Sequence, residues 1–297
     1  MSWIVFELII WAFLLSVGAF LLIEAKRKTR SKQRRGVWWL LLAAWVTIFW
    51  GSFVEPRLLM VREETVAVSS APQRTLRAAV VSDIHAGPYK GKGWVSEVVE
   101  AVNAEHPDVV FLVGDSISNS PADALALEPL RGLVAPMGVY AVTGNHDYED
   151  GAAEYVAATL ETLGVRMLRD SSVRIADGKI VLVGVNDLWN GGNIYRAVSG
   201  LRAEDTIILL AHNPDAVLDP ETAVVDLVVA GHTHGGQIRL PFWGSVPHIP
   251  TDLGNAYDKG LFVYNGEQLY ITAGVSETGT RARLFNPPEI SVLNIEY

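Results

Sequence analysis

The sequence feature that most constrains the fold is an apolar run that ends in two closely spaced histidines. Leu227-Val228-Val229-Ala230 is followed directly by Gly231-His232-Thr233-His234-Gly235-Gly236. Side chains alternate between the two faces of a strand, so His232 and His234 can point to one side and hold a metal there. The glycines let the backbone turn tightly and approach a bound group. Taken alone, the motif is equally typical of an ordinary turn with two solvated histidines.

The same arrangement recurs along the second part of the chain. Short apolar runs occur at 78–81, 109–113, 139–142, 180–185, 207–210 and 227–230, and segments of helical pattern occur at 93–105 and 123–134. Asn265-Gly266, between the runs 261–264 and 269–272, predicts a β-hairpin. Strand–helix–strand units of this kind predict a layered α/β domain.

Polar groups that can bind a metal follow most of these apolar runs. In chain order they are Asp83, His85, Asp115, Asn145, His146, His212, His232 and His234. Sites in open α/β sheets form beyond the carboxyl ends of strands, so these side chains can converge although they are distant in sequence. Each one also has an ordinary explanation, as a helix cap, a turn residue or a half-buried histidine. Their repeated occurrence at one topological position favours a single shared site. His106 and His248 fall outside the pattern and are predicted to be surface residues.

Composition narrows the chemistry. The chain has no cysteine, which excludes disulfides and thiolate metal sites, so nitrogen and oxygen atoms must hold any metal. Residues 55–297 contain 17 basic and 31 acidic residues, a formal charge of −14. We therefore expect no nucleic-acid-binding surface.

Two apolar stretches precede the α/β domain, at 3–23 and 37–54. The first has the length of a membrane-spanning helix and the second is shorter. Seven cations lie between them at 26–35, and the positive-inside rule places that loop in the cytoplasm. A cleaved signal peptide is disfavoured, because Met1-Ser2 supplies no cation before the first run. The sequence thus predicts a multi-pass cell-membrane protein with two transmembrane helices in 1–54, a connector at 55–76, and an extracytoplasmic α/β domain at 77–297.

The polar blocks together resemble a known family. Asp83-Ile84-His85, Gly114-Asp115, Gly144-Asn145-His146-Asp147, His212 and Gly231-His232-Thr233-His234 are similar to the motifs of calcineurin-like metallophosphoesterases, here in a membrane-anchored, bacterial-type phosphodiesterase branch. The resemblance covers roughly residues 77–297, with all five blocks in family order. It implies a sandwich of two β-sheets flanked by helices, and a two-metal phosphoester hydrolase.

Carried over by position, the resemblance implies a ligand set for two divalent ions. Asp83, His85 and His234 would hold one ion, Asn145, His212 and His232 the other, and Asp115 would bridge them. Manganese, iron and zinc all suit these ligands. His146 would protonate the leaving oxygen or stabilise the transition state. The family usually has another aspartate where this chain has Ser118, a departure that affects local hydrogen bonding more than metal binding.

The favoured function is phosphodiester hydrolysis at or near the membrane. The alternatives are a pyrophosphatase of diacylated sugar nucleotides, a phosphomonoesterase, a phosphoprotein phosphatase, and a catalytically idle module that binds a phosphorylated ligand. Candidates at every ligand position favour an enzyme over the idle module. A sugar-nucleotide substrate would be made on the cytoplasmic side, opposite to the predicted domain. Trp189, Phe242 and Trp243 are candidates for an apolar lip that contacts a lipid-linked phosphoester, although packing under loops explains them equally well.

Overall fold

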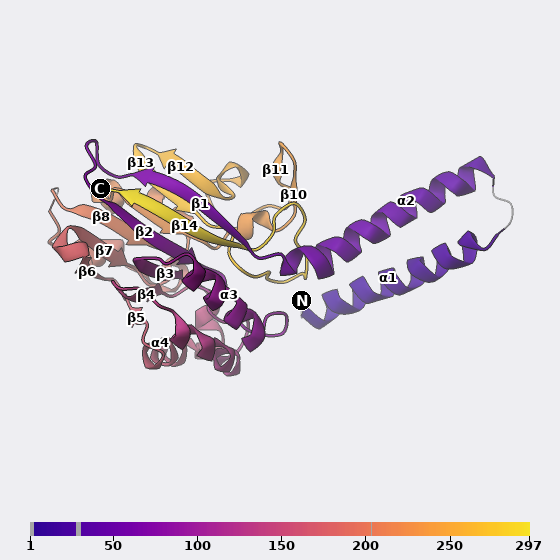
Figure 1. Ribbon diagram of the computed structural model, residues 1–297, viewed down its shortest axis with the longest axis horizontal. Coiled ribbons are helices and arrows are strands. Elements are labelled where there is room, and N and C mark those ends of the chain that lie inside the picture. Colours follow the sequence, from indigo (N-terminus) through magenta and orange to yellow (C-terminus); the bar gives the residue numbers. More distant parts are fainter. Residues whose placement is uncertain (1–2, 28–30, 203) are drawn as a thin grey trace.

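The computed structural model describes residues 3–27, 31–202 and 204–297, and it shows a helical hairpin that projects from an α/β domain (Figure 1). The hairpin consists of α1 (Trp3–Ala25) and α2 (Lys32–Phe49), and α2 continues through further helical turns to Arg57. Both helices are long and apolar enough to cross a membrane. Part of the predicted basic loop, residues 28–30, lies outside the described residues.

Indole hydrogen bonds join the two helices of the hairpin. Trp45 Nε1 donates to the carbonyl of Leu14 at 2.8 Å, and Trp38 Nε1 donates to the carbonyl of Leu21 at 3.1 Å. A buried indole N–H needs an acceptor, and here the facing helix supplies it. Glu24 forms ion pairs at 3.0 Å with Arg27 and Arg34 at the end of the hairpin far from the domain.

The domain is built on two six-stranded sheets. The strands of the first are β1 (Met60–Ala67), β2 (Thr75–Val81), β3 (Val109–Val113), β4 (Val139–Val142), β5 (Arg166–Met167) and β14 (Glu289–Glu296). Those of the second are β6 (Ser171–Ile175), β7 (Ile180–Gly184), β8 (Thr206–Leu210), β9 (Leu227–Ala230), β12 (Gly260–Tyr264) and β13 (Glu267–Ile271). The spatial orders are β1-β14-β2-β3-β4-β5 and β12-β13-β9-β8-β7-β6. Strands β2 to β5 run parallel, as do β7, β8, β9 and β13.

Apolar side chains fill three layers. The central layer lies between the sheets and includes Phe111, Leu182 and Tyr270. On the outer face of the first sheet pack α3 (Lys92–Ala104) and α4 (Ala153–Thr162), and α5 (Ile194–Val198) packs on the second. Central strands are thus buried on both faces, which explains why they are continuous apolar runs rather than alternating ones. The predicted two-sheet sandwich flanked by helices is confirmed.

Every predicted strand is present, and two segments differ from expectation. The α-helix predicted at 123–134 is absent: 3₁₀ turns span Pro121–Gly132, because Pro129 lacks the N–H that an α-helix needs there. The predicted connector 55–76 contains β1, which pairs in parallel with β14. Its residues are mostly exposed and include the charged run Arg62-Glu63-Glu64, as suits an edge strand, and this hides the strand from hydrophobic patterning.

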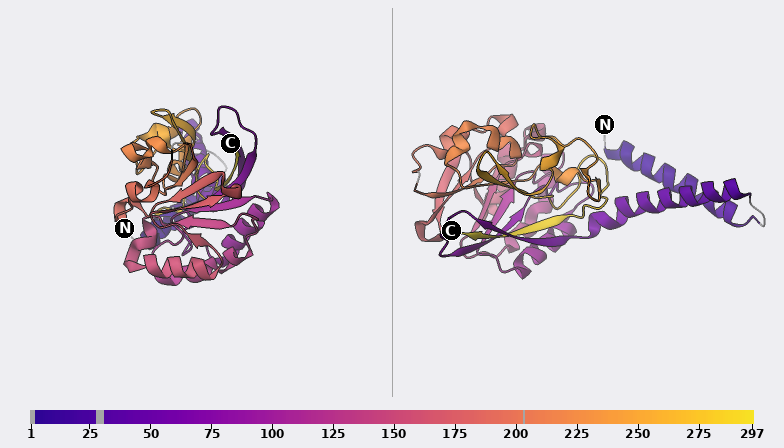
Figure 2. Two further views of the ribbon diagram at one scale, coloured as in Figure 1. Left: turned by 90° about the vertical axis from the view of Figure 1, so that its left-hand side faces the viewer. Right: turned by 90° about the horizontal axis from the view of Figure 1, so that it is seen from above.

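Strand direction places one end of the domain against the hairpin. β1 begins three residues after Arg57 and is parallel to β14, which is antiparallel to β2. The carboxyl end of β2, and of the strands parallel to it, therefore lies at the end where the hairpin is attached. Figure 2 shows this end of the domain from above, with both helices leaving it.

The loop after β13 holds the hairpin to the domain. Arg283 donates from its backbone N to the carbonyl of Gly51 at 2.8 Å, and Arg281 Nε lies 3.0 Å from Glu7 of α1. The buried carboxylate of Glu55 accepts from the backbone N of Asn286 and from Trp50 Nε1. These contacts tie both helices to one segment, residues 281–286.

Candidate metal centre

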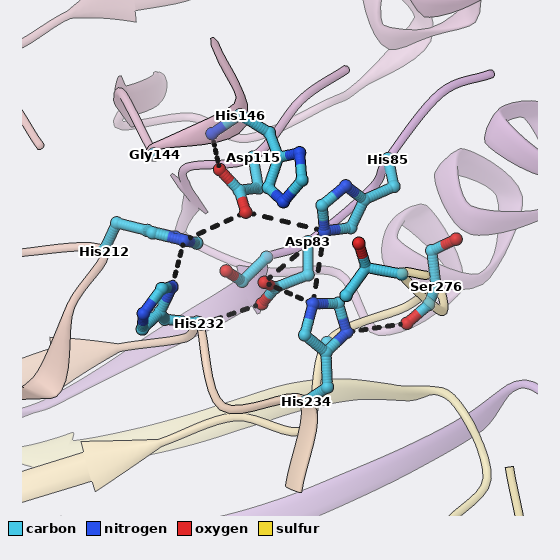
Figure 3. A network of polar contacts seen from close by, with 12 residues as sticks. Asp83, His85, Asp115, Gly144, His146, His212, His232, His234 and Ser276 are labelled. Carbon is cyan, nitrogen blue, oxygen red and sulfur yellow. Dashed lines mark hydrogen bonds and ion pairs between the residues drawn. The ribbon is translucent and has the colours of Figure 1, made fainter. Parts of the chain in front are cut away.

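The predicted polar residues follow five strand ends and converge. Asp83 and His85 follow β2, Asp115 follows β3, and Asn145 with His146 follows β4; from the second sheet, His212 follows β8 and His232 with His234 follows β9. The three strand ends of one sheet therefore face the two of the other. Figure 3 shows the aspartates and histidines pointing toward one another.

One group consists of Asp83, His85 and His234. His234 Nε2 lies 3.3 Å from Asp83 Oδ1 and 3.2 Å from His85 Nε2. All three side chains are buried, and one ligand atom from each lies within 4.8 Å of the others. Two imidazoles and a carboxylate at this spacing can hold a divalent cation.

A second group consists of Asp115, His212 and His232. His212 Nε2 lies 3.2 Å from Asp115 Oδ2 and 3.2 Å from His232 Nδ1. The same oxygen, Asp115 Oδ2, is also 3.5 Å from His85 Nε2 in the first group. A single carboxylate therefore contacts both groups.

Three buried atoms of the candidate ligands make no hydrogen bond with the described residues. They are Asp83 Oδ1, whose contact with His234 Nε2 does not have hydrogen-bond geometry, Asn145 Oδ1 and His232 Nε2. Burying a polar atom without a partner is costly, so such atoms require an explanation. All three are lone-pair donors of the types that bind divalent metals, and this donor set fits the two ions that the sequence predicts.

The backbone at the site is strained in a consistent way. Asp83, His85, Asp115, His232 and His234 all have positive φ, between 42° and 69°. Residues other than glycine rarely adopt this conformation, and such strain concentrates at functional sites. The strand ends therefore turn sharply and aim their side chains inward at some cost to stability.

Close backbone approach explains the glycine of the block Gly114-Asp115. A Cβ atom on Gly114 would lie 2.6 Å from His212 Nδ1 and 2.7 Å from the backbone N of Gly144. Its φ of 79° is likewise in the left-handed region. A larger residue here would displace His212.

Burial sets the protonation of the histidines. It lowers the pKa of His85, His232 and His234 to about 3, so these imidazoles are neutral and able to ligate. Burial would also lower the pKa of His212, but the Asp115 carboxylate raises it to about 10. The Asp115 carboxylate thus favours a positive charge next to it in the buried site. A bound cation would supply that charge in place of the proton on His212.

Outer hydrogen bonds orient the candidate ligands. His212 Nδ1 lies 2.8 Å from the carbonyl of Val113, and His234 Nδ1 lies 3.0 Å from the carbonyl of Ser276. Each contact directs Nε2 of its ring toward an aspartate, as in metal sites whose histidines donate from the other nitrogen. Asp147 accepts from the backbone N of Ser116 and of Gly144, at 2.8 and 2.9 Å, and so joins two of the loops.

His146 lies beside the two groups. Its backbone N donates to Asp115 Oδ1 at 2.8 Å, and its Nδ1 lies 2.8 Å from Glu149 Oε1 and 3.0 Å from the carbonyl of Ser118. Ser118 Oγ donates in turn to the carbonyl of His85 at 2.7 Å. The residue at which the chain departs from the family pattern therefore links His146 to the loop that carries His85.

A cavity of about 510 Å³ opens above the site. Its lining includes Asp115, Asn145, His146, His232 and His234, and also Trp189, His248 and residues 278–280. The ring of Trp189 meets that of His232 edge-on, with centroids 4.7 Å apart. Of the predicted lip, only Trp189 lies at this cavity; Phe242 and Trp243 belong to a different loop.

Sequence patterning missed several of these residues. His248 is exposed, as predicted, yet it lines the cavity. Ser276 and the cavity wall at 278–280 follow β13. The apolar run 269–272 therefore indicated a strand end whose following residues could belong to the site. Ser276 contributes a backbone carbonyl, however, and no side-chain pattern identifies such a group. Glu149 lies two residues after the block Gly144-Asn145-His146-Asp147, and only its distance from the His146 ring reveals a role.

A two-sheet α/β sandwich with buried aspartate and histidine groups at its strand ends defines the class of metal-dependent phosphoesterases. The family model of calcineurin-like phosphoesterases matches residues 76–236, more than half of the chain. The chain belongs to this family, as its sequence motifs indicated.

The relatives differ in how much of their length the chain spans. The "Uncharacterized metallophosphoesterase YkuE" of Bacillus subtilis is 30% identical over 285 residues, which cover 91% of this chain and 99% of that protein. The "Transmembrane protein with metallophosphoesterase domain" of Danio rerio is 33% identical over 234 residues, covering 73% of this chain and 52% of that protein. Among solved structures, the phosphopantetheinyl hydrolase PptH of Mycobacterium tuberculosis is similar with a TM-score of 0.40 and 14% identity, over 67% of this chain and 89% of that one.

We predict that divalent metal stabilises the folded protein. A ligand that binds only the folded state adds about 2.7 kcal/mol to the free energy of unfolding when present at about 100 times its Kd. Chelator-treated full chain should therefore melt at a lower temperature than the same protein with added manganese or zinc, measured by near-UV circular dichroism. The variant His106→Asn, at an exposed position outside the site, should show the same metal-dependent shift. Identical melting temperatures with and without metal would contradict the prediction.

Proposed function

We propose that this protein is a membrane-anchored, two-metal phosphoester hydrolase, with an anchor in residues 1–54 and a catalytic domain in 77–297. The observation that carries the proposal is the pair of buried ligand groups that share Asp115 beneath an open cavity. Asp83, His85 and His234 would hold one ion, and Asn145, His212 and His232 the other. The ligand types suit manganese, iron or zinc.

The chain's own residues supply the remaining functions. Ions held at this site would supply Lewis acidity, the property that activates water and stabilises charge on phosphoryl oxygens. Since Nδ1 of His146 is engaged by Glu149 and Ser118, its Nε2 is the nitrogen available to a substrate in the cavity. Contacts with the Glu149 carboxylate and the Ser118 carbonyl hold the ring in place, and we propose His146 as the proton donor to the leaving oxygen.

The charge of the cavity favours a diester over a monoester. Among the described residues that line it, none is lysine or arginine. A monoester carries up to two negative charges and is commonly clamped by arginine in addition to metal, whereas a diester carries one. We therefore favour phosphodiester hydrolysis, with Trp189 as an apolar wall for the second ester group.

The position of the cavity favours a substrate at the membrane. The site lies at the carboxyl ends of the strands, which is the end of the domain where the hairpin is attached. Thr280 and Ala282 line the cavity and flank Arg281, which pairs with Glu7 of α1. We propose a lipid-linked phosphoester as the substrate, hydrolysed on the extracytoplasmic face.

Asp115→Asn should abolish turnover and weaken the binding of both ions, because a carboxylate shared by two cations compensates charge on each. Turnover of a diester panel and metal content by mass spectrometry measure the two effects. Asp177→Asn, at an exposed carboxylate remote from the site, is the matched control and should behave as wild type. Two tightly held ions and normal turnover in Asp115→Asn would refute the bridging role.

His146→Ala should keep both ions and lose turnover by about 10²–10⁴-fold, the effect of removing a general acid. The loss should be much smaller for a nitrophenyl diester than for an alkyl diester, because a good leaving group needs no proton. His106→Asn serves as the control. An equal loss on both substrates would exclude proton donation and leave charge stabilisation by His146.

A reporter fused after Tyr297 tests the orientation. The basic segment between the two helices predicts a cytoplasmic loop, which places both outer ends of the hairpin and the domain outside the cytoplasm. An alkaline phosphatase fusion, active only outside the cytoplasm, should be active, and a green fluorescent protein fusion should be dark. The opposite pair of results would reverse the orientation.

A further inference from the structure

The most exposed large apolar side chains of the described residues lie together on one small hairpin. It is formed by β10 (Arg239–Leu240) and β11 (Gly244–Ser245), which pair in antiparallel fashion. Its tip carries Phe242, 111% exposed relative to the reference state, and Trp243, 82% exposed. The eight residues 240–247 contain no charged side chain. Two aromatic rings projecting into water lose the stabilisation that burial would give them.

The backbone at the tip holds Phe242 in an unfavourable conformation. Trp243 N donates to the carbonyl of Leu240 at 3.1 Å and closes a four-residue turn with Pro241 at its second position. Phe242 occupies the third position with φ of 66°, where glycine is usual. A bulky residue with positive φ is rare and strained. The turn therefore presents an aromatic ring where glycine would be easier to accommodate, which indicates that the ring contacts something outside the domain.

A short series of hydrogen bonds places this hairpin beside the base of the membrane helices. Arg239 N donates to the carbonyl of Leu284 at 2.9 Å. Arg283, the residue before Leu284, donates from its backbone N to the carbonyl of Gly51, just after α2. Figure 1 shows β10 and β11 at the end of the domain from which the helices leave. If α1 and α2 span the bilayer, the surface of that bilayer lies at this end.

We propose that the β10–β11 hairpin inserts its tip into the membrane interface as a third contact beside the two helices. Tryptophan and phenylalanine favour the boundary between headgroups and acyl chains, and the uncharged tip adds no cost of burying charge. Leu240 and Val246, each about half exposed, widen the apolar surface. The inference rests on the proposed membrane anchoring and does not depend on the reaction.

Insertion of the tip would also position the cavity. Residues 236–238 before the hairpin and 247–250 after it line the cavity above the metal site. A tip fixed in the interface therefore fixes one wall of the cavity at the level of the lipid headgroups. This supplies a physical reason for a membrane-borne phosphoester to reach the site without leaving the bilayer.

The test uses a single label in the full chain. The protein has no cysteine, so Trp243→Cys creates a unique site for an environment-sensitive fluorophore. The control is Asn265→Cys, in the β12–β13 turn. Asn265 lines one pocket with Val68, which follows the end of β1 that lies away from the helices, so this position is at the opposite end of the domain. In nanodiscs that hold one copy each, brominated lipid should quench the label at 243 and aqueous iodide should not. The label at 265 should show the reverse. Iodide quenching at both positions would overturn the proposal.

A second variant separates membrane contact from packing within the domain. Phe242→Gly relieves the positive φ, so in detergent its melting temperature should equal or exceed that of wild type. Combined with the label at 243, it should reduce quenching by brominated lipid. A lower melting temperature with unchanged quenching would assign Phe242 to packing and overturn the proposal. Neither readout uses turnover, so failure of the hydrolase assignment would not affect this test.

Discussion

The site depends on the charge of one buried carboxylate, that of Asp115. Its Oδ2 lies within 3.5 Å of a histidine from each of the two ligand groups, and its Oδ1 accepts the backbone N of His146. Burial alone would raise the pKa of this carboxyl, but His212 and His85 hold it well below its usual range. A buried anion needs compensation, and His85, His232 and His234 are neutral imidazoles that supply no positive charge. A site of this kind stabilises bound cations. Cations placed there can stabilise the negative charge that develops during phosphoryl transfer.

The two sheets serve to deliver side chains to that carboxylate. Parallel strands end at a common edge, so each strand contributes its first residues beyond the sheet to the same place. The positive φ of five candidate ligands and the close contact at Gly114 show how tightly these ends are folded inward. The core between the sheets supplies the stability that offsets this strain.

Much of this arrangement could be predicted from the sequence, because burial on both faces makes the central strands continuous apolar runs and each run is followed by a polar group. The edge strand β1 escaped prediction since its residues 60–67 are mostly exposed. The helix expected at 123–134 was wrong because local periodicity ignores the missing N–H of Pro129. The role of Ser276 was also hidden, as it acts through a backbone carbonyl. The sequence identified Phe242 and Trp243 as candidates for an apolar lip. Only the folded chain shows that both are exposed and that neither lines the cavity.

The attachment of the hairpin and the location of the site are two consequences of one topology. The loop after β13 orients His234 through Ser276, lines the cavity, and contacts both helices through Arg281 and Arg283. We propose that Asp115 lies between two ions, and anomalous diffraction from crystals of the manganese-loaded protein would locate them. Two peaks are expected, one among Asp83, His85 and His234 and one among Asn145, His212 and His232, with Asp115 in contact with both. A single peak, or a second peak away from Asp115, would refute the bridging position of this carboxylate.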